Sequence, residues 1–572
     1  MRKNADVAKI LYEVADLLEI QDVQWKPQAY RKAAQAIENL QEDIETVIEE
    51  GRLEDLPGVG THIAEKVKEI VKTGKLQYLN TLKKHVPIDV ESLSSIEGLG
   101  PKTLKYLYKK LHVKNLADLK KAAMAGKIKA LKGMGEKKEK MILEGVKLVQ
   151  KRGPKRLLLG SITPLADEIC SLLKKVDGVQ QTTIAGSYRR GLAMIGDIDI
   201  LLISSKPKKA MDAFVSIPDI EKVLAHGERR SSIRLRNGLQ VDARALKKEQ
   251  YGSALLYFTG SKEHNVAVRK RALKKGLTLS EYGLFTVRGK KLVASTTEDA
   301  VYKRLGMQYI PPEMREDRGE IELALNKKIP ALISWKDIRG DFQTQTKWSD
   351  GADSIEEMAA YAERLGWKFL VITDHVGGIG IARPLDEKRL AKQAKEIDAI
   401  NKKSSVHIFK GAEIDIKKNG ELALSKKACG ALDVVLASVH SAFRMPQKEM
   451  TQRLCDVIGN SCVNILGHPL GRLLNQREPI SFDTEKVFQA AKDHHVFLEV
   501  NGQPSRMDLP DDLIHKAREM GCQFVVSSDA HTKEQLLYTK YGVLTARRGW
   551  LEKKHVLNTM SVKEIKKILE TK

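Results

Sequence analysis

The chain has 572 residues, of which 42% are hydrophobic and 30% charged, and its formal net charge is +24 at pH 7. This length predicts several domains that each bury a core, and the composition is typical of a soluble globular protein. No segment approaches the roughly 18 consecutive apolar residues of a membrane helix, and the amphipathic N-terminus favours a folded helix over a signal peptide. The five cysteines form no CxxC pair, so we expect a cytoplasmic protein without a disulfide framework or zinc ribbon.

A short pattern repeats three times near the N-terminus, at residues 56–67, 96–107 and 131–142. Each copy reads apolar-x-Gly-apolar-Gly before a helix start, which is typical of a helix-hairpin-helix. The glycines allow a phosphate to approach the free N–H groups of the next helix. A single copy could be an ordinary turn with no binding role. Three copies with the same flanking residues predict contacts to a nucleic-acid backbone through Gly58, Gly60, Gly98, Gly100, Gly133 and Gly135.

A basic excess accompanies these repeats. Residues 101–156 hold 18 Lys and Arg against 4 Asp and Glu, a net charge of +14. A solvated basic face is the ordinary explanation of a charge run, but this density favours a polyanion partner bound through salt-sensitive phosphate contacts.

Two aspartates stand two residues apart in the expected strand GDIDILL. Asp197 and Asp199 therefore point from one face, where like charges repel and burial is costly. A third carboxylate, Asp242, lies in the apolar strand LQVDARAL. Just upstream, TTIAGSYRRG offers a strand-to-helix turn at Gly186, with Ser187 and Arg190 able to contact a phosphate. The carboxylates could instead be strand ends bonded to loop amides, but together with the turn they predict two Mg²⁺ ions and in-line phosphoryl transfer.

The C-terminal part alternates strands with helical patterns, which predicts β/α units around a parallel sheet or barrel. Histidines and acids stand at the ends of its expected strands, where β/α barrels place their sites. Imidazole and carboxylate together suit Zn²⁺ or Mn²⁺. The candidate ligands are His375, Glu413, His440, His468, Asp529 and His531.

The motifs GS-x-RRG, G-D-I-D and a later single Asp occur in this order, and the C-terminal motifs follow them. This arrangement resembles a family X DNA polymerase of the bacterial and archaeal type, with a C-terminal PHP (polymerase and histidinol phosphatase) domain. The resemblance covers essentially the whole chain. It implies a multidomain α/β protein with a helical helix-hairpin-helix region, a nucleotidyltransferase palm with a mixed sheet and a distorted seven-stranded β/α barrel. Asp197, Asp199 and Asp242 would hold two Mg²⁺ or Mn²⁺ ions, with Asp242 nearest the primer 3′-hydroxyl. Ser187 and Arg190 would hold the triphosphate, with Gly186 at the turn.

The segment YFTGSKEHNVAVRKRA, residues 257–272, fits the same family. By resemblance, YFTGS is a turn in which Tyr257 and Phe258 pack under the deoxyribose and discourage a 2′-hydroxyl. The remaining nucleotide-binding residues implied here are Gly260, Asn265 at the minor-groove edge of the base and Arg269 at the template strand. From its residues alone, the segment could be an aromatic-glycine turn before a basic helix.

The segment QWKPQAYRKAAQAI and the first hairpin resemble the small DNA-end-binding domain of the family. In relatives, the lysine matching Lys66 attacks C1′ of an abasic sugar and releases the 5′-phosphosugar through a Schiff base. Lys26, Tyr30 and Arg31 are expected to converge on Lys66, and Lys26, Tyr30 and His62 are expected to bind DNA. Nearby cations would make Lys66 a better nucleophile. The alternative is that Lys66 contacts only phosphate. His62 stands where relatives often place another lysine.

The PHP resemblance implies that Glu413 bridges metals, with His440 and His468 on one ion and the group Asp350, His375 and His531 on another. The family expects His-x-His in a stretch ending S-D-G, but this chain has DFQTQTKWSDG, with Gln343 and Gln345 at those positions. A metal shared with Glu413 and Asp529 would therefore lose two imidazole ligands. The 3′–5′ exonuclease of relatives is in question here, and we expect Zn²⁺ or Mn²⁺ at incomplete occupancy.

These patterns predict a monomeric, template-directed DNA polymerase that fills short gaps during repair, with gapped or primed DNA and dNTP as partners. An untemplated nucleotidyltransferase acting on RNA ends and a noncatalytic DNA-end scaffold are the alternatives. The expected domains are an end-binding domain at 1–85, a duplex-binding domain at 86–150, a palm at 151–245, a nucleotide-selecting subdomain at 246–315, a linker at 316–335 and the PHP domain at 336–572.

Overall fold

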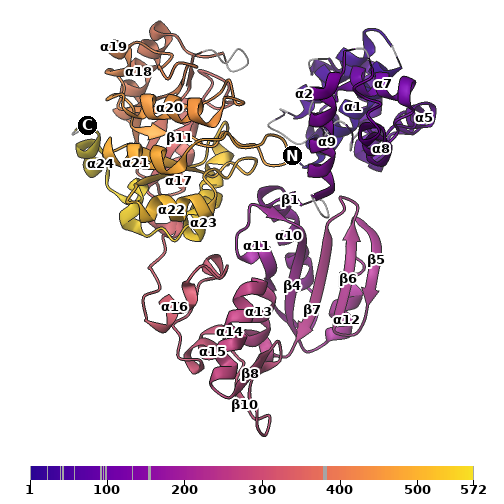
Figure 1. Ribbon diagram of the computed structural model, residues 1–572, viewed down its shortest axis with the longest axis vertical. Helices are drawn as coiled ribbons and strands as arrows, with labels where there is room; N and C mark the ends of the chain where they lie inside the picture. The colour runs from indigo at the N-terminus through magenta and orange to yellow at the C-terminus, as the bar shows by residue number, and fades with distance from the viewer. Residues whose placement is uncertain are drawn as a thin grey trace. The chain divides into compact units, whose positions relative to one another are not determined.

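The computed structural model describes residues 2–21, 23–38, 40, 44–56, 58–90, 93, 96, 99–131, 133–151, 156–377 and 383–570. The chain divides into two compact units, Met1–Pro154 and Lys155–Lys572, which are described one after the other (Figure 1). Over the described ranges, no helix combines the length and the apolar character needed to cross a membrane.

Over its described residues, the first unit contains helices joined by turns and loops, and no strands. One apolar core runs through it from Val7 of the first helix to Val146 of the last. Gly60 and Gly100 are the N-caps of the helices that follow the first two repeats, and Gly135 is the first residue of the helix after the third. Gly98 lies outside the described residues. The helices are α1 Arg2–Ile20, α2 Lys26–Glu38, α3 Ile44–Glu49, η1 Leu53–Asp55, α4 Thr61–Thr73, α5 Gln77–His85, α7 Pro101–Leu111, α8 Leu116–Met124 and α9 Gly135–Lys151.

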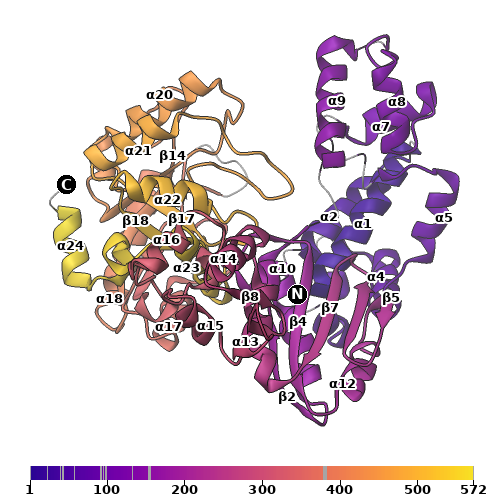
Figure 2. The same cartoon turned by 60° about the horizontal axis from the view of Figure 1, so that its bottom comes forward.

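A five-stranded sheet forms the predicted palm. Its strand order is β2-β4-β7-β6-β5, in which β4 and β7 run parallel and the other neighbours antiparallel. Apolar side chains of α10 and α12 share one buried cluster with the sheet, and Figure 2 shows the strands from a second side. The elements are β1 Leu157–Leu158, α10 Leu159–Lys174, β2 Val179–Ile184, α11 Gly186–Arg189, β3 Met194–Ile195, β4 Asp197–Ser204, α12 Pro207–Phe214, β5 Ile220–His226, β6 Arg230–Leu235 and β7 Gln240–Leu246.

A smaller helical subdomain with a three-stranded antiparallel sheet follows. Here the structure corrects one expectation, because Tyr257 and Phe258 lie in the last turns of α13 and the chain turns only at Gly260. The buried run from Gly252 to Leu256 extends the helix toward them. The elements are η2 Lys248–Gln250, α13 Tyr251–Thr259, α14 Lys262–Lys274, β8 Leu277–Ser280, β9 Gly283–Thr286, β10 Leu292–Ala294, α15 Glu298–Arg304, η3 Pro312–Met314, α16 Glu320–Leu325 and η4 Trp335–Asp337.

The C-terminal domain is the predicted parallel barrel. Seven strands follow one another in the order β11-β12-β14-β15-β16-β17-β18, and short β13 pairs with β14 beyond the end of β12. A parallel bridge between Thr344 and Ala530 joins the first strand to the segment after the last. The strands are β11 Gly340–Thr344, β12 Phe369–Ile372, β13 His375–Val376, β14 His407–Asp415, β15 Val434–Ser438, β16 Ile465–Leu466, β17 Phe497–Asn501 and β18 Phe524–Ser527.

Helices surround this barrel and share its apolar core. The cluster that contains Phe342, Phe369 and Phe409 is joined by Leu557 and Ile565 from the C-terminal end of the chain. The helices are α17 Ile355–Arg364, α18 Glu387–Asn401, α19 Lys426–Cys429, α20 Gln447–Ile458, α21 Thr484–Asp493, α22 Asp511–Glu519, η5 Lys533–Tyr538, α23 Thr539–Arg548, η6 Lys553–His555, η7 Leu557–Thr559 and α24 Val562–Glu570.

Candidate active sites

The palm sheet brings the three predicted aspartates together. Asp197 and Asp199 lie on β4, and parallel β7 places Asp242 directly opposite Asp199. Gly186, in the turn before these strands, lies against Asp199. It has a φ of +62°, and a Cβ there would lie 2.7 Å from Oδ2 of Asp199. A side chain at position 186 would therefore both strain the backbone and displace Asp199. The turn and the carboxylates form one compact site.

The charges of this site favour a bound cation. Burial and the carboxylates of Asp197 and Asp242 raise the pKa of Asp199 to about 7, although Arg244 and Arg190 oppose this. Asp242 is oriented by the hydroxyl of Ser232 and by the amide of Gln240, whose Nε2 donates to Oδ2 at 2.9 Å. Carboxylates that destabilise one another by repulsion are suitable ligands for divalent cations, which cancel the repulsion.

The predicted phosphate-binding residues follow directly after Gly186 in α11. Arg190 caps this helix and directs its guanidinium toward the end of α13, where Nη1 donates to the carbonyl of Thr259 at 2.6 Å. Nη1 also lies 3.1 Å from the position of a Cβ at Gly260. Ser187 occupies the first turn of the same short helix. The structure thus assembles Gly186, Ser187, Arg190 and Gly260 at one junction.

The other predicted nucleotide-binding residues lie on either side of this junction. Cζ of the Arg244 guanidinium lies 4.5 Å from the ring centre of Phe258, and the rings of Tyr257 and Phe258 meet edge to face with their centres 5.1 Å apart. Asn265 donates through Nδ2 to the carbonyl of Tyr257 at 2.7 Å, and Arg269 lies one helical turn further on. These contacts join Tyr257 and Phe258 to α14 and to the strand that carries Asp242.

Sequence reasoning missed the residues that support the palm site. Ser232 and Gln240 orient Asp242, and Arg244 is two residues after Asp242 on the same strand. The alternation of β7 was a usable signal for Gln240 and Arg244, since positions 240, 242 and 244 share one face. Ser232 comes from the antiparallel neighbour β6, and nothing near it in the sequence indicates that pairing.

The candidate lyase site of the first unit is partly assembled. Nζ of Lys66 donates to the carbonyl of His62 at 3.2 Å and lies 5.2 Å from the ring centre of Tyr78. Tyr30 is buried and stacks on the same Tyr78 ring at 6.4 Å. Arg31 is expected to lie near Lys66, but its ion pairs are with two acids of α1, Asp16 at 2.7 Å and Glu19 at 2.6 Å. Lys26 is the first residue of α2.

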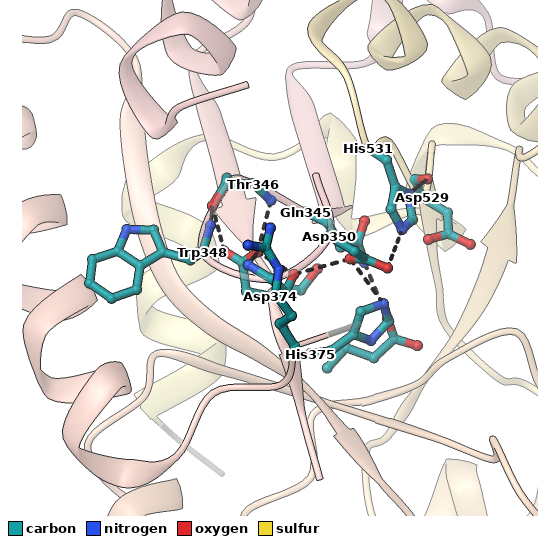
Figure 3. A network of polar contacts seen from close by, with 12 residues as sticks. Gln345, Thr346, Trp348, Asp350, Asp374, His375, Asp529 and His531 are labelled. Carbon is teal, nitrogen blue, oxygen red and sulfur yellow. Dashed lines mark hydrogen bonds and ion pairs between the residues drawn. The ribbon is translucent and has the colours of Figure 1, made fainter. Parts of the chain in front are cut away.

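In the C-terminal domain, one group of predicted ligands surrounds Asp350. Its carboxylate lies 3.6 Å from Nε2 of His375 and 3.6 Å from Nε2 of His531 (Figure 3). The three ligand atoms are close enough to hold one metal ion. Asp374, next to His375, is not part of this group: it accepts hydrogen bonds from the loop that carries Asp350, including Thr346 N at 2.8 Å. Asp374 therefore shapes the loop that presents Asp350.

A second group centres on buried Glu413. Oε1 lies 2.9 Å from Nε2 of His468 and 3.2 Å from Nε2 of His440, whereas Oε2 lies 3.3 Å from Nδ1 of His375. His375, Glu413 and His440 form the second arrangement able to hold a metal ion. Asp415 orients His440 through a 2.6 Å contact to Nδ1. Such acid-imidazole pairs commonly orient metal-binding histidines.

The two glutamines fill the remaining side of this pocket. Gln345 donates through Nε2 to Oε2 of Glu413 at 3.1 Å, and Gln343 accepts from Nδ2 of Asn501 at 3.2 Å. Asp529 faces cationic Arg506, whose Nε is 3.2 Å from Oδ2, and also accepts from Asn501. Among the described residues, neither metal-compatible group includes Asp529 or His468. Amide and guanidinium groups thus contact carboxylate oxygens of Glu413 and Asp529, two residues that the sequence predicted as metal ligands.

Neighbouring carboxylates raise the pKa of two histidines in this pocket. Burial alone would lower the pKa of His440, but Glu413 and Asp415 raise it to about 9. His531 behaves alike, since Asp350 and Asp529 overcome its burial and raise its pKa to about 9. Burial and Asp529 raise the pKa of Glu499, which sequence reasoning missed. The carboxylates and imidazoles around His375 fit a divalent ion, whereas Gln343 and Gln345 offer only neutral amides on the other side.

Comparison with known families agrees with this architecture. Residues 161–254 match the DNA polymerase beta palm, residues 254–316 the DNA polymerase beta thumb and residues 341–503 the PHP domain. Residues 2–76 match a helix-hairpin-helix domain and residues 90–147 a SAM-like helix-hairpin-helix tandem. Families of these kinds generally use divalent metal ions.

Individual relatives point the same way. The chain is 35% identical over 569 residues, 99% of both chains, to the DNA polymerase/3′-5′ exonuclease PolX of Bacillus subtilis (strain 168). It is 25% identical over 341 residues to DNA polymerase lambda of Rattus norvegicus, covering 55% of this chain and 56% of that protein. A probable phosphatase of Thermoanaerobacter sp. (strain X514) is 32% identical over 243 residues, 41% of this chain and 94% of that protein. The chain belongs to the family X DNA polymerases that carry a C-terminal PHP domain, and it is a DNA polymerase of the repair type.

Proposed function

We propose that this polymerase fills short gaps by adding dNTP to a primer 3′-hydroxyl at the site of Asp197, Asp199 and Asp242. The observation that carries the proposal is the parallel pairing of β4 with β7, which sets Asp199 opposite Asp242 beside Gly186. In this assignment the three carboxylates hold two Mg²⁺ or Mn²⁺ ions, which neutralise the triphosphate and favour ionisation of the 3′-hydroxyl.

The neighbouring side chains supply the remaining functions. Arg190 and Ser187 orient the triphosphate, and Gly186 leaves room for it beside Asp199. Tyr257 and Phe258 underlie the sugar, held by Arg244 and by the contact from Asn265. Asn265 is assigned to the minor-groove edge of the base and Arg269 to the template. The helix-hairpin-helix turns would hold the duplex on both sides of the gap.

Templated gap filling tests this proposal against untemplated nucleotide transfer. On a one-nucleotide gap with a downstream 5′-phosphate, we expect incorporation of the complementary dNTP, with little rNTP use because an aromatic pair faces the sugar. Extension of a single strand without template, or equal use of rNTP and dNTP, would instead support the untemplated alternative.

For the PHP domain we propose a reduced metal site and a weak 3′–5′ exonuclease. Asp350, His375 and His531 would hold one Zn²⁺ or Mn²⁺ ion, and His375, Glu413 and His440 fit a second position. The contacts of Gln343, Gln345, Asn501 and Arg506 support the loss of an ion beside Asp529. The relative in Bacillus subtilis is named an exonuclease, and both glutamines weigh against equal activity here.

We further propose a 5′-deoxyribose-phosphate lyase in the first unit, with Lys66 as nucleophile. Its amine would add to C1′ of the open sugar and lose water to form a Schiff base. Loss of a C2′ proton would then break the C3′–O3′ bond and leave a 5′-phosphate on the DNA, and water would hydrolyse the imine to release the unsaturated phosphosugar and the free amine. Borohydride reduction of a mixture with 5′-deoxyribose-phosphate DNA should trap a covalent complex, and Lys66→Ala should abolish it. Lys68→Ala, a change of an exposed lysine on the same helix, is the matched control. Equal trapping by Lys66→Ala would exclude Lys66 as nucleophile.

We also propose that the protein has the domain limits given above, is a monomer and is located in the cytoplasm. All five cysteines are free thiols in the structure, as suits a reducing compartment. The basic excess of residues 101–156 supports DNA as the partner.

A further inference from the structure

A chain of alternating charges links Arg190 of the palm to the PHP domain. Nε of Arg190 lies 3.0 Å from Oε1 of Glu316, and the same oxygen lies 2.9 Å from Nη1 of Arg548 at the end of α23. Nη2 of Arg548 reaches Oδ2 of Asp511 at 2.8 Å, and Arg318 reaches that oxygen at 2.9 Å. Arg190, Glu316 and Arg548 are each less than 20% exposed, so water screens this network weakly.

Arg548 also holds the backbone of Arg190. Its Nη1 donates to the carbonyl of Arg190 at 2.9 Å. The next residue, Gly191, has a φ of +74°, and a Cβ there would lie 2.4 Å from Cγ of Leu544, one helical turn before Arg548. The C-terminal end of α11 therefore packs directly on α23. Met507 of the PHP domain is buried in the apolar cluster of the palm, so this contact continues into the core.

The shared oxygen of Glu316 determines how much positive charge Arg190 can offer. If Glu316 were paired with Arg190 alone, its carboxylate would neutralise the charge of Arg190. It would also compete with a phosphate for the N–H donors of Arg190. Arg548 takes part of that pairing, which leaves a net positive charge on the Arg190–Glu316–Arg548 group. Among the described residues, the hydrogen bonds of Arg190 are made by Nε and Nη1, and none is made by Nη2.

We propose that Arg548 of the PHP domain is a positioning residue for dNTP binding: it anchors the backbone of Arg190 and shares Glu316, which keeps the Arg190 guanidinium available to the triphosphate. The PHP domain thereby supports the polymerase reaction through a contact that is independent of its own metal ligands. This inference rests on the proposed role of Arg190.

Single-turnover gap filling with the full chain tests this, because it yields the apparent dNTP Kd and the maximal rate separately. Arg548→Ala should raise the Kd about tenfold while the maximal rate changes less, since the residue acts on phosphate binding through Arg190. Arg548→Lys, which keeps the charge, should give a Kd nearer to the natural value. Arg548→Gln, which removes the charge but keeps more of the side-chain volume, should raise the dNTP Kd as Arg548→Ala does. If the alanine variant does not fold, the glutamine variant is used in its place.

Arg547→Ala is the matched control. Arg547 is the preceding residue of α23, and it pairs with Glu313 at 2.7 Å and donates to the carbonyl of Ile333, without contacting Arg190. Its dNTP Kd should stay within about twofold of the natural value. An unchanged Kd in Arg548→Gln, or an equal rise in Arg547→Ala, would overturn the inference.

Arg190→Ala separates this inference from the proposed function. If Arg190→Ala leaves the dNTP Kd unchanged, the role of Arg190 itself fails. If Arg190→Ala raises the Kd and the Arg548 variants do not, only the contribution of the PHP domain fails. In the double variant Arg190→Ala/Arg548→Ala, we expect no further rise beyond Arg190→Ala, because both changes act on one contact.

Discussion

Asp199→Asn should lower the maximal rate of primer extension by roughly a thousandfold, because the loss of a metal-binding carboxylate removes several kcal/mol of charge stabilisation. The fold and DNA binding should persist. Asp199 is half-buried, and burial and the nearby carboxylates raise its pKa to about 7, so we expect a neutral amide of the same shape to be accommodated. Single-turnover extension gives the rate, and fluorescence anisotropy with gapped DNA gives the affinity.

The matched control for this change is Asp177→Asn. Asp177 lies in the same domain but is exposed and pairs with two surface lysines, Lys206 and Lys209. The same removal of a carboxylate there should leave the extension rate unchanged. Extension by Asp199→Asn at the natural rate would overturn the metal assignment, and a parallel loss of DNA binding would show that the residue serves the fold instead.

Replacing both glutamines of the PHP domain with histidine should raise 3′–5′ degradation with Mn²⁺ by roughly tenfold or more, by analogy with the changes that ligand environments produce. In the natural chain, Gln345 donates an amide to Glu413 and Gln343 pairs with Asn501. Imidazoles at these positions would offer two strong ligands in place of neutral amides. The assay is the shortening of a 5′-labelled strand, with the Asp199→Asn change present so that resynthesis does not obscure it.

Bound manganese gives a second readout for the same variant. Its Mn²⁺ content after dialysis should exceed that of the natural chain, and Gln523→His, the same change at an exposed position, should alter neither quantity. A double variant with unchanged metal content and unchanged degradation would show that the glutamines do not limit the site.

Local patterns were sufficient for much of the fold. Alternation along GDIDILL placed Asp197 and Asp199 on one face of a strand, and the glycine repeats placed Gly60 and Gly100 at helix starts. The histidines of the C-terminal motifs lie on or directly after barrel strands, as their spacing predicted. In each case the signal lies within a few residues and reflects backbone geometry.

Other features depend on pairings between distant segments. Glu316 lies 126 residues after Arg190, and Arg548 lies 358 residues after it. No periodicity relates them, so only the folded chain shows the shared oxygen. The pairing of Gln343 with Asn501, 158 residues away, is of the same kind. The family resemblance implies a turn at YFTGS, but the buried run from Gly252 to Leu256 extends the helix to Thr259 instead.

We propose that the palm holds a whole set of metal ligands whereas the PHP domain lacks part of its set. The most direct measurement follows a 5′-labelled primer strand in a gapped duplex at single-nucleotide resolution, in Mn²⁺, with and without the complementary dNTP. We predict that the strand grows to fill the gap when dNTP is present and shortens slowly or not at all when dNTP is absent. Rapid shortening without dNTP, or no growth with it, would contradict the account.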